Sequence, residues 1–191
     1  MINKKEEAIL ICATELFSRF GYHAVGVDLI VEKSNVAKMT FYKYFPSKNI
    51  LIQRVLVRRG LDLQKMLTDG ASRAHTPLGR LKSIFNWYES WLTSSDFNGC
   101  MFIKASEEFP EPDGPIKQVT QAHKAWFTGY ISELLADLSV ANAQKVAKYI
   151  VVVLEGLSVS SNMYKVNNLS EIRFSWRCVK QIVEANQLVK A

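Results

Sequence analysis

The chain has 191 residues, of which 48% are apolar, and this composition suits a soluble globular protein with its own core. Its longest apolar run covers residues 149–154, well short of the roughly 20 needed to cross a bilayer, and its first residues lack a signal-peptide pattern, so we expect no membrane segment. The three cysteines are scattered and form no CxxC pair, which favours small core side chains in a reduced, cytoplasmic protein.

Positive charge is concentrated in the first third of the chain. Residues 1–60 carry ten Lys and Arg against five Asp and Glu, a net charge of +5, whereas the whole chain has +6. Such a split is typical of a head that binds a polyanion and is attached to a nearly neutral body. A basic surface that serves only solubility would show the same asymmetry, so charge alone leaves both interpretations open.

Three helices are predicted near the N-terminus. Apolar residues recur at helical spacing over 4–20, at Ile9, Ala13, Leu16, Phe17 and Phe20. Gly21 suits the position just after this helix. Two shorter helices are expected over 27–34 and 38–44, and Asn35 between them tolerates the positive φ that a tight turn requires. The sequence therefore predicts a helix-turn-helix.

The helix over 38–44 divides into a buried side and a free side. The predicted core of the helix-turn-helix consists of Leu29, Ile30, Val36, Phe41 and Phe45. The free face carries the remaining residues, Lys38, Met39, Thr40, Tyr42, Lys43 and Tyr44. A short helix with Lys, Thr and Tyr on its free face suits the major groove of DNA. The alternative is an ordinary solvated face, with the ring of Tyr44 packed inward.

Each side chain of the free face offers a contact to DNA. The two lysines can neutralise phosphates or reach guanine edges, and the threonine can bond to a base or a phosphate. The two tyrosines can donate to phosphate oxygens. Lys48 adds a positive charge at the start of the following helix, whose N-terminal amides form an anion site of their own.

Residues 6–56 resemble the helix-turn-helix domain of the TetR family of transcriptional regulators, and beyond them the likeness is one of layout. The residues that carry it are the run TFYKYF at Thr40–Phe45, Pro46-Ser47-Lys48, and the phased entry through Phe17, Phe20-Gly21-Tyr22 and Val27–Ile30.

The resemblance implies roles for six residues. Those at positions that usually touch the DNA backbone are Thr40, Tyr42 and Lys48, and those that read bases or flank them are Lys38, Met39 and Lys43. Two positions depart from the family pattern, because Gly26 and Ala37 stand where Ser or Thr is usual. Both lose a side-chain N-cap, worth about 1 kcal/mol for Ala and a few tenths for Gly, and a hydroxyl that could hold phosphate.

Six more helices are predicted in the body. The fourth begins after Pro46 with Ser47 as its N-cap and continues past Gly60 to about residue 68. The next four are expected over 78–94, 100–109, 116–138 and 140–164, with Ser139 capping the last of them. A turn over 166–169 and a cap at Ser170 introduce a final helix to about residue 188. No alternating strand pattern occurs, and the role of Gly60 as a bend or a close-packing site is left open.

Aromatic residues are dense between Phe85 and Tyr130. They could line an apolar ligand cavity or fill a core. The family resemblance implies an effector site in this region, which favours a pocket. The candidate lining residues are Trp87, Trp91, Phe102, Trp126 and Tyr130.

The last two helices have unusually broad apolar faces. Residues 150–159 and 174–183 are rich in Val, Ile, Leu and aromatic side chains, and Gly156 permits close approach of another backbone. Such a pair often forms a four-helix seam with a second copy of the chain, although it could equally close the monomer core. The resemblance implies the same two-helix homodimer seam.

No motif for catalysis, a metal or a cofactor is found. The chain lacks G-x-S-x-G, H-E-x-x-H and a phosphate-binding glycine loop, and its three histidines are isolated. The acidic residues Glu107, Glu108, Glu111 and Asp113 are attributed to a solvated loop, the alternative being attraction of a cationic effector or ion. Cys100 is read as a neutral thiol, with a redox sensor as the alternative.

The sequence therefore predicts an all-α, nine-helix, two-domain homodimer. Residues 1–48 form a helix-turn-helix DNA-binding head, and residues 49–191 a ligand-binding and dimerisation body. The expected function is a repressor that binds a palindromic operator and is released by a small apolar or aromatic effector. The alternatives are a helical carrier or enzyme with an incidental basic head, and an architectural DNA-binding protein without a ligand.

Overall fold

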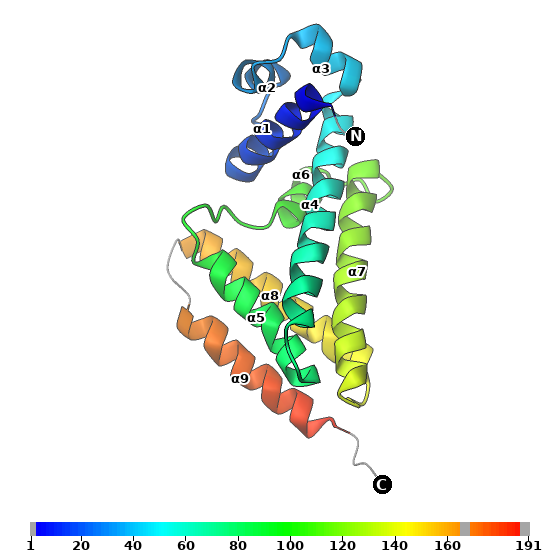
Figure 1. The fold of residues 1–191 in the computed structure, drawn as a ribbon, viewed down its shortest axis with the longest axis vertical. Helices are drawn as coiled ribbons and strands as arrows, with labels where there is room; N and C mark the ends of the chain where they lie inside the picture. Colours follow the sequence, from blue (N-terminus) through cyan, green and yellow to red (C-terminus); the bar gives the residue numbers. More distant parts are fainter. Residues whose placement is uncertain (1–2, 165–168, 188–191) are drawn as a thin grey trace. The chain divides into compact units, whose positions relative to one another are not determined.

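The computed structural model describes residues 3–164 and 169–187 of the chain. Over these ranges the protein is all α-helical, as predicted, with a single β-bridge between Val140 and Gln187. The helices of the described chain are α1 (Lys4–Phe20), α2 (Val27–Ser34), α3 (Lys38–Tyr44), α4 (Lys48–Ser72), α5 (Pro77–Leu92), α6 (Met101–Glu108), α7 (Pro115–Asp137), α8 (Ala143–Tyr164) and α9 (Leu169–Ala185) (Figure 1).

The chain divides into two compact units. The N-terminal unit comprises Met1–Leu61 and Cys100–His123, and the C-terminal unit comprises Asp62–Gly99 and Lys124–Ala191. The long helices α4 and α7 therefore contribute residues to both units. The predicted functional boundary at residues 48 and 49 lies inside the N-terminal unit and stays a prediction.

The three helices of the predicted helix-turn-helix have the bounds expected from the sequence. The side chain of Asn3 caps α1 by accepting from the backbone N–H of Lys5 at 3.0 Å, and Gly21 ends the helix with a φ of 80°. Asn35 takes the left-handed conformation, with φ 52° and ψ 41°, and so turns the chain between α2 and α3. Local capping and turn chemistry thus account for this part of the fold.

The core of these helices is fully buried at Phe17, Ile30, Phe41 and Phe45. Three residues at the predicted apolar positions are more exposed than the rest, and the first of them, Leu16, is half-buried. Leu29 is half-buried, and Phe20 is 52% exposed beneath the guanidinium of Arg19, which lies 5.2 Å from the ring centroid. Phe20 is the last residue of α1, so helical spacing alone could not show whether any element covers it.

Helix α4 is longer than predicted. It begins as expected after Ser47, whose hydroxyl accepts from the N–H of Ile50 at 3.2 Å, but it continues through Gly70 to Ser72. The sequence predicted an end at about residue 68, shortly before Gly70, and glycine costs about 1 kcal/mol in a helix interior. Burial of Leu67 and Ala71 on the same turns provides the packing that offsets this cost.

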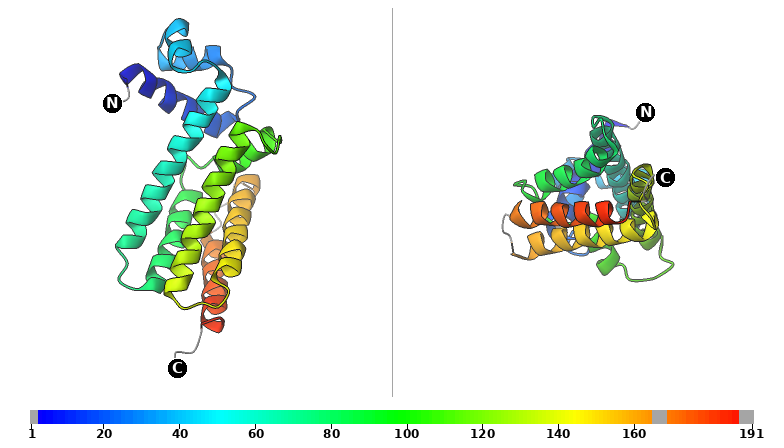
Figure 2. Two further views of the ribbon diagram at one scale, coloured as in Figure 1. Left: turned by 90° about the vertical axis from the view of Figure 1, so that its right-hand side faces the viewer. Right: turned by 90° about the horizontal axis from the view of Figure 1, so that it is seen from below.

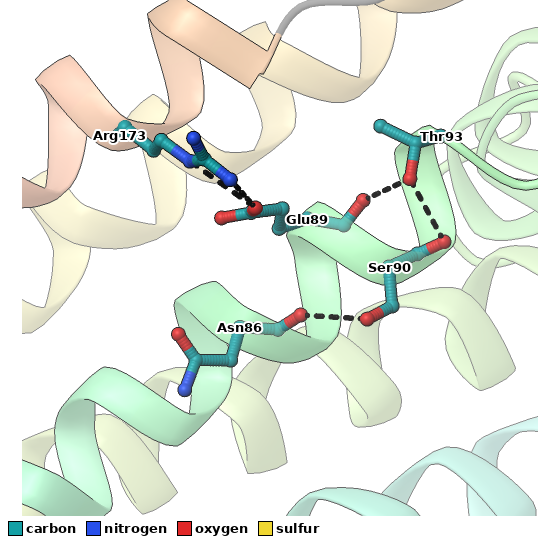
Figure 3. Close-up of polar contacts among 5 residues, drawn as sticks. All are labelled: Asn86, Glu89, Ser90, Thr93 and Arg173. Atoms are coloured by element: carbon teal, nitrogen blue, oxygen red, sulfur yellow. Dashed lines mark hydrogen bonds and ion pairs between the residues drawn. The ribbon is translucent and has the colours of Figure 1, made fainter.

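The C-terminal unit is built on helices α5, α8 and α9. Figures 1 and 2 show α8 and α9 side by side with α5 beside them, and their buried faces share one apolar core. Arg173 on α9 donates to a carboxylate oxygen of Glu89 on α5 at 2.7 Å, which joins these helices at the edge of the core (Figure 3). Helix α8 alone, among the described residues, is long and apolar enough to cross a bilayer, and one side of it is buried in the core of this unit.

Two helix starts in this unit differ from the prediction. Helix α8 begins at Ala143 rather than at residue 140, and the predicted cap Ser139 instead adopts a positive φ of 57°. The β-bridge between Val140 and Gln187 fixes the turn between α7 and α8. The other predicted cap, Ser170, lies inside α9, where its hydroxyl bonds to Glu171 at 2.7 Å. Residues 166–168 of the predicted turn lie outside the described residues.

Candidate DNA-binding interface

Helix α3 presents most of its predicted contact residues to solvent. Lys38 and Lys43 are exposed, and Met39 is 82% exposed, which is unusual for a large apolar side chain. The ring of Tyr42 is also exposed and packs edge-on against buried Phe41, with the centroids 5.3 Å apart. The exposed face thus combines two cations, a phenol and an apolar side chain able to meet a thymine methyl.

Two of the predicted contact residues on α3 are only partly exposed. Thr40 and Tyr44 are both half-buried, so the face of α3 is narrower than the sequence predicted. For Tyr44 this agrees with the alternative in which its ring packs inward. The exposed residues of the helix are therefore Lys38, Met39, Tyr42 and Lys43.

Lys38 is held by an acidic partner on the neighbouring helix. Its Nζ lies 2.6 Å from Oδ1 of Asp28, near the start of α2. The hydrogen bond from Lys38 and the negative charge of Asp28 raise the pKa of the lysine. A phosphate that approaches Lys38 must therefore compete with this carboxylate.

Lys48 is half-buried, unlike the lysines of α3. Its Nζ lies 3.4 Å from the backbone carbonyl of His23, to which it donates a hydrogen bond. Burial lowers the pKa of Lys48, and the charge of Glu108 opposes this shift. The ammonium group is thus directed at the loop between α1 and α2, beside the N-terminus of α4.

The two missing N-caps are confirmed. Gly26 precedes α2 and Ala37 precedes α3, and neither helix start has a side-chain hydrogen bond. Both residues adopt the extended conformation usual for a cap, so the backbone keeps its geometry without the hydroxyl.

Ion pairs between α1 and α4 were not predicted from the sequence. Arg54 donates to Glu6 at 2.7 Å, and Arg58 forms a two-pronged pair with Glu7 at 2.6 and 2.7 Å. The paired residues are 48 and 51 positions apart in the sequence, too far for helical spacing to indicate that they meet. These pairs attach the first helix of the head to the helix that leads away from it.

The predicted ligand-binding residues are distributed over both units. In the C-terminal unit Trp87 stacks on Trp91 with centroids 5.2 Å apart, and Trp126 stacks on Tyr130 at 5.4 Å. Phe102 belongs to the N-terminal unit, where it is buried and stacks on His123 at 3.8 Å. The pairs in the C-terminal unit pack against its core, and their role in ligand binding stays a prediction.

The C-terminal unit also contains an open cavity of about 620 Å³ between α7 and α8. Its wall is made mainly of small and polar residues, namely Lys124, Ala125, Thr128, Gly129, Ser132, Glu133, Ala136, Gln144 and Lys148. Its volume is in the usual range for small-molecule sites. None of the five predicted ligand-binding residues lines it. The sequence did not predict this cavity, because its lining residues are small or polar and the prediction relied on aromatic residues.

The cysteines are less buried than predicted. All three are free thiols and each is half-buried. Burial raises the pKa of Cys12, which keeps that thiol protonated and weakly reactive. Cys100 precedes α6 as its capping residue without a side-chain hydrogen bond.

Comparison with known proteins agrees with the head described above. Residues 9–55, which contain most of α1, all of α2 and α3, and the start of α4, match the family model for bacterial regulatory proteins of the tetR family. The HTH-type transcriptional activator FasR of Mycolicibacterium smegmatis is 28% identical over 87% of this chain and 74% of its own length. The HTH-type transcriptional regulator YjdC of Escherichia coli is 24% identical over 80% of each chain.

Solved structures share the complete fold. A TetR-family transcriptional regulator from Streptomyces coelicolor superposes with a TM-score of 0.90 at 22% identity, covering 96% of both chains. The reduced form of NemR from Escherichia coli superposes with a TM-score of 0.83 at 16% identity, covering 94% of this chain and 98% of its own. The helix-turn-helix, the family match and the curated relatives agree: residues 9–55 form a helix-turn-helix domain of the tetR family, and the chain is similar to DNA-binding transcriptional regulators over most of its length.

Proposed function

We propose that the protein is a cytoplasmic repressor that binds a palindromic operator as a homodimer and is released by a small apolar or aromatic effector. The observation that carries this proposal is the exposed face of α3, where Lys38, Met39, Tyr42 and Lys43 stand clear of the core. In a dimer the two copies of this face would enter successive major grooves, so a two-fold protein would select a two-fold DNA site.

A dimer seam through α8 and α9 is supported by their exposed apolar residues. Val152 and Phe174 are 64% and 59% exposed, and Tyr149, Val159 and Met163 are also accessible. Side chains of this size are rarely left in water over a continuous helix face unless a partner covers them. Gly156 leaves open space beside them, into which a second helix could pack.

An effector would bind in the C-terminal unit. The stacked pairs Trp87–Trp91 and Trp126–Tyr130 offer flat apolar surfaces, which favours an aromatic or apolar molecule. The effector can change DNA binding only by its different affinities for two conformations of the dimer. The proposal specifies repression, although one relative of the chain is named as an activator.

The test begins with selection of random double-stranded oligonucleotides by the full-length protein in the presence of excess competitor DNA. We expect an inverted repeat to be enriched, with half-sites about one helical turn apart. A reporter placed behind the selected sequence should be less active when the protein is expressed. Binding that depends on salt but not on sequence would contradict the proposal, and a more active reporter would make the protein an activator.

Release by an effector is tested separately. A panel of apolar and aromatic compounds is screened for dissociation of the selected duplex. Quenching of tryptophan fluorescence by the same compounds should follow the same concentration dependence. A panel that dissociates no duplex and quenches no fluorescence would leave a DNA-binding protein without the proposed effector.

A further inference from the structure

Glu108, the last residue of α6, is bonded to the loop that joins α1 and α2. Its carboxylate accepts from the backbone N–H of Tyr22, with both oxygens at 2.9 Å, and from the N–H of His23 at 2.6 Å. Gly21 allows this approach, since a Cβ at that position would lie 2.7 Å from Oε1 of Glu108. Glu108, which was predicted to lie in a solvated loop, therefore accepts hydrogen bonds from two successive backbone amides.

Three further hydrogen bonds attach α6 to the same segment. The hydroxyl of buried Tyr22 donates to the backbone carbonyl of Met101 at 2.9 Å, at the start of α6. Nε2 of His23 lies 2.8 Å from the carbonyl of Glu108, and Nζ of Lys104 donates to the carbonyl of Ser18 at 2.6 Å. The whole length of α6 is thus bonded to the end of α1 and the loop after it, within one compact unit.

The same loop contacts a lysine of the predicted DNA-binding face. The carbonyl of His23 accepts from Nζ of Lys48 at 3.4 Å, while the N–H of His23 is bonded to Glu108. The His23 residue therefore links the carboxylate on α6 to the ammonium group at the start of α4. Hydrogen bonds to charged groups are the stronger ones in proteins, so this link restrains the loop more than neutral contacts would.

We propose that Glu108 is a positioning residue for DNA binding, which holds the loop between α1 and α2 so that Lys48 is set against the DNA backbone. The proposal rests on the proposed function, since it requires that Lys48 contact a phosphate. It makes α6 part of the DNA-binding head, and a displacement of α6 would be transmitted to the loop through the carboxylate.

The test compares Glu108→Gln and Glu108→Ala with Glu107→Ala, which removes the exposed acid next to Glu108. Glutamine keeps the size of the side chain but loses its charge and places an NH₂ group against the backbone donors. The probe is the duplex selected by the wild-type chain, titrated at several salt concentrations. We expect both Glu108 variants to bind about tenfold more weakly and Glu107→Ala to bind as the wild type does.

A double-mutant cycle with Lys48→Met separates positioning from a loss of stability. If Glu108 acts through Lys48, the double variant Glu108→Gln/Lys48→Met should bind no more weakly than Lys48→Met alone. The slope of log K against log salt should also fall by about one in each single variant. Additive losses, or an unchanged salt slope, would overturn the proposal.

Amide hydrogen exchange checks the contact without DNA. The amides of Tyr22 and His23 should be protected in the wild type and in Glu107→Ala, and should exchange freely in Glu108→Ala while the α1 amides stay protected. Unchanged protection would overturn the proposed restraint. A wild-type chain that selects no duplex would overturn the proposed function as well. Equal affinities of the wild type and Glu108→Gln for the selected duplex would overturn this proposal alone.

Discussion

The ammonium group of Lys38 on α3 lies 2.6 Å from the carboxylate of Asp28, so the neighbouring helix α2 supplies a counter-charge to the predicted DNA-binding face. Both side chains are more than half exposed, at 56% and 82%, and such pairs add little to stability. The consequence of the pair is therefore expected in DNA binding, where phosphate and Asp28 compete for the same lysine.

We predict that Asp28→Asn binds DNA severalfold more tightly at low salt. The substitution removes a negative charge from the binding face and releases Lys38, and the gain should shrink as salt screens both charges. Titrations at rising salt measure the effect. Glu32→Gln makes the same charge change elsewhere on α2 and should have a smaller effect on DNA binding. Weaker binding by Asp28→Asn would contradict the prediction and would mean that Asp28 orients Lys38 for its contact with DNA.

Lys43→Ala should weaken binding to the selected duplex by about tenfold. Lys43 is exposed on α3, so its loss should leave the thermal unfolding midpoint unchanged. The slope of log K against log salt should fall by about one if the lysine contacts a phosphate. Lys82→Ala, at an exposed position of α5, is the charge-matched control, and equal affinities of the two variants would show that the predicted DNA-binding face is wrongly placed.

Gly60 is a close-packing position in α4. A Cβ there would lie 3.4 Å from Nδ1 of His123 and 3.8 Å from Cζ of Phe102, which stack on each other. Alanine should fit and raise the free energy of unfolding by up to about 1 kcal/mol through its helix propensity. Leucine should lower it, because its branches meet the stacked rings.

Gly70 provides the matched control for Gly60, since nothing lies within 4 Å of a Cβ built there. Both Gly70→Ala and Gly70→Leu should stabilise α4 by similar amounts in urea denaturation. A destabilising Gly70→Leu would show that helix propensity is not what the comparison measures.

Val152→Asp should dissociate the proposed dimer. The substitution places a charge in the middle of the exposed apolar face of α8, where a buried and unpaired carboxylate is costly. Sedimentation equilibrium should show a monomer at concentrations where the wild type is dimeric. Met66→Asp, on the exposed side of α4, should leave the mass unchanged, and a dimeric Val152→Asp would place the seam elsewhere.

The pair between Glu7 and Arg58 should make stability depend on pH. The hydrogen bonds from Arg58 lower the pKa of Glu7 in the folded protein, so the unfolded chain binds more protons in acid. The contribution is therefore present above the ordinary glutamate pKa and is lost as pH falls through the lowered one. Because the pair is about one-third exposed, we expect less than about 1 kcal/mol.

Urea unfolding of the wild type and of Glu7→Gln measures this contribution. The wild type should be more stable at pH 7, and the two curves should converge as the pH falls below about 4. A difference that persists in acid would mean that packing, and not the charge of Glu7, is responsible.

The sequence alone determined the helix-turn-helix, because its signals are local. Helical spacing, Gly21 and Asn35 placed α1, α2 and α3 within the same bounds as the structure, and the exposed cations of α3 followed from the burial of Phe41 and Phe45. Each of these signals depends on residues within a few positions of one another, where backbone geometry dictates the outcome.

Only the tertiary structure decided which distant residues meet. Glu108 and His23 are 85 positions apart, and nothing in the acidic run near Glu108 distinguishes the carboxylate that binds two amides from its solvated neighbours. The passage of α4 through Gly70 and the separation of Phe102 from the tryptophans into different units likewise follow from long-range packing. Local propensities amount to about 1 kcal/mol or less at each residue, and burial of a few apolar side chains outweighs them.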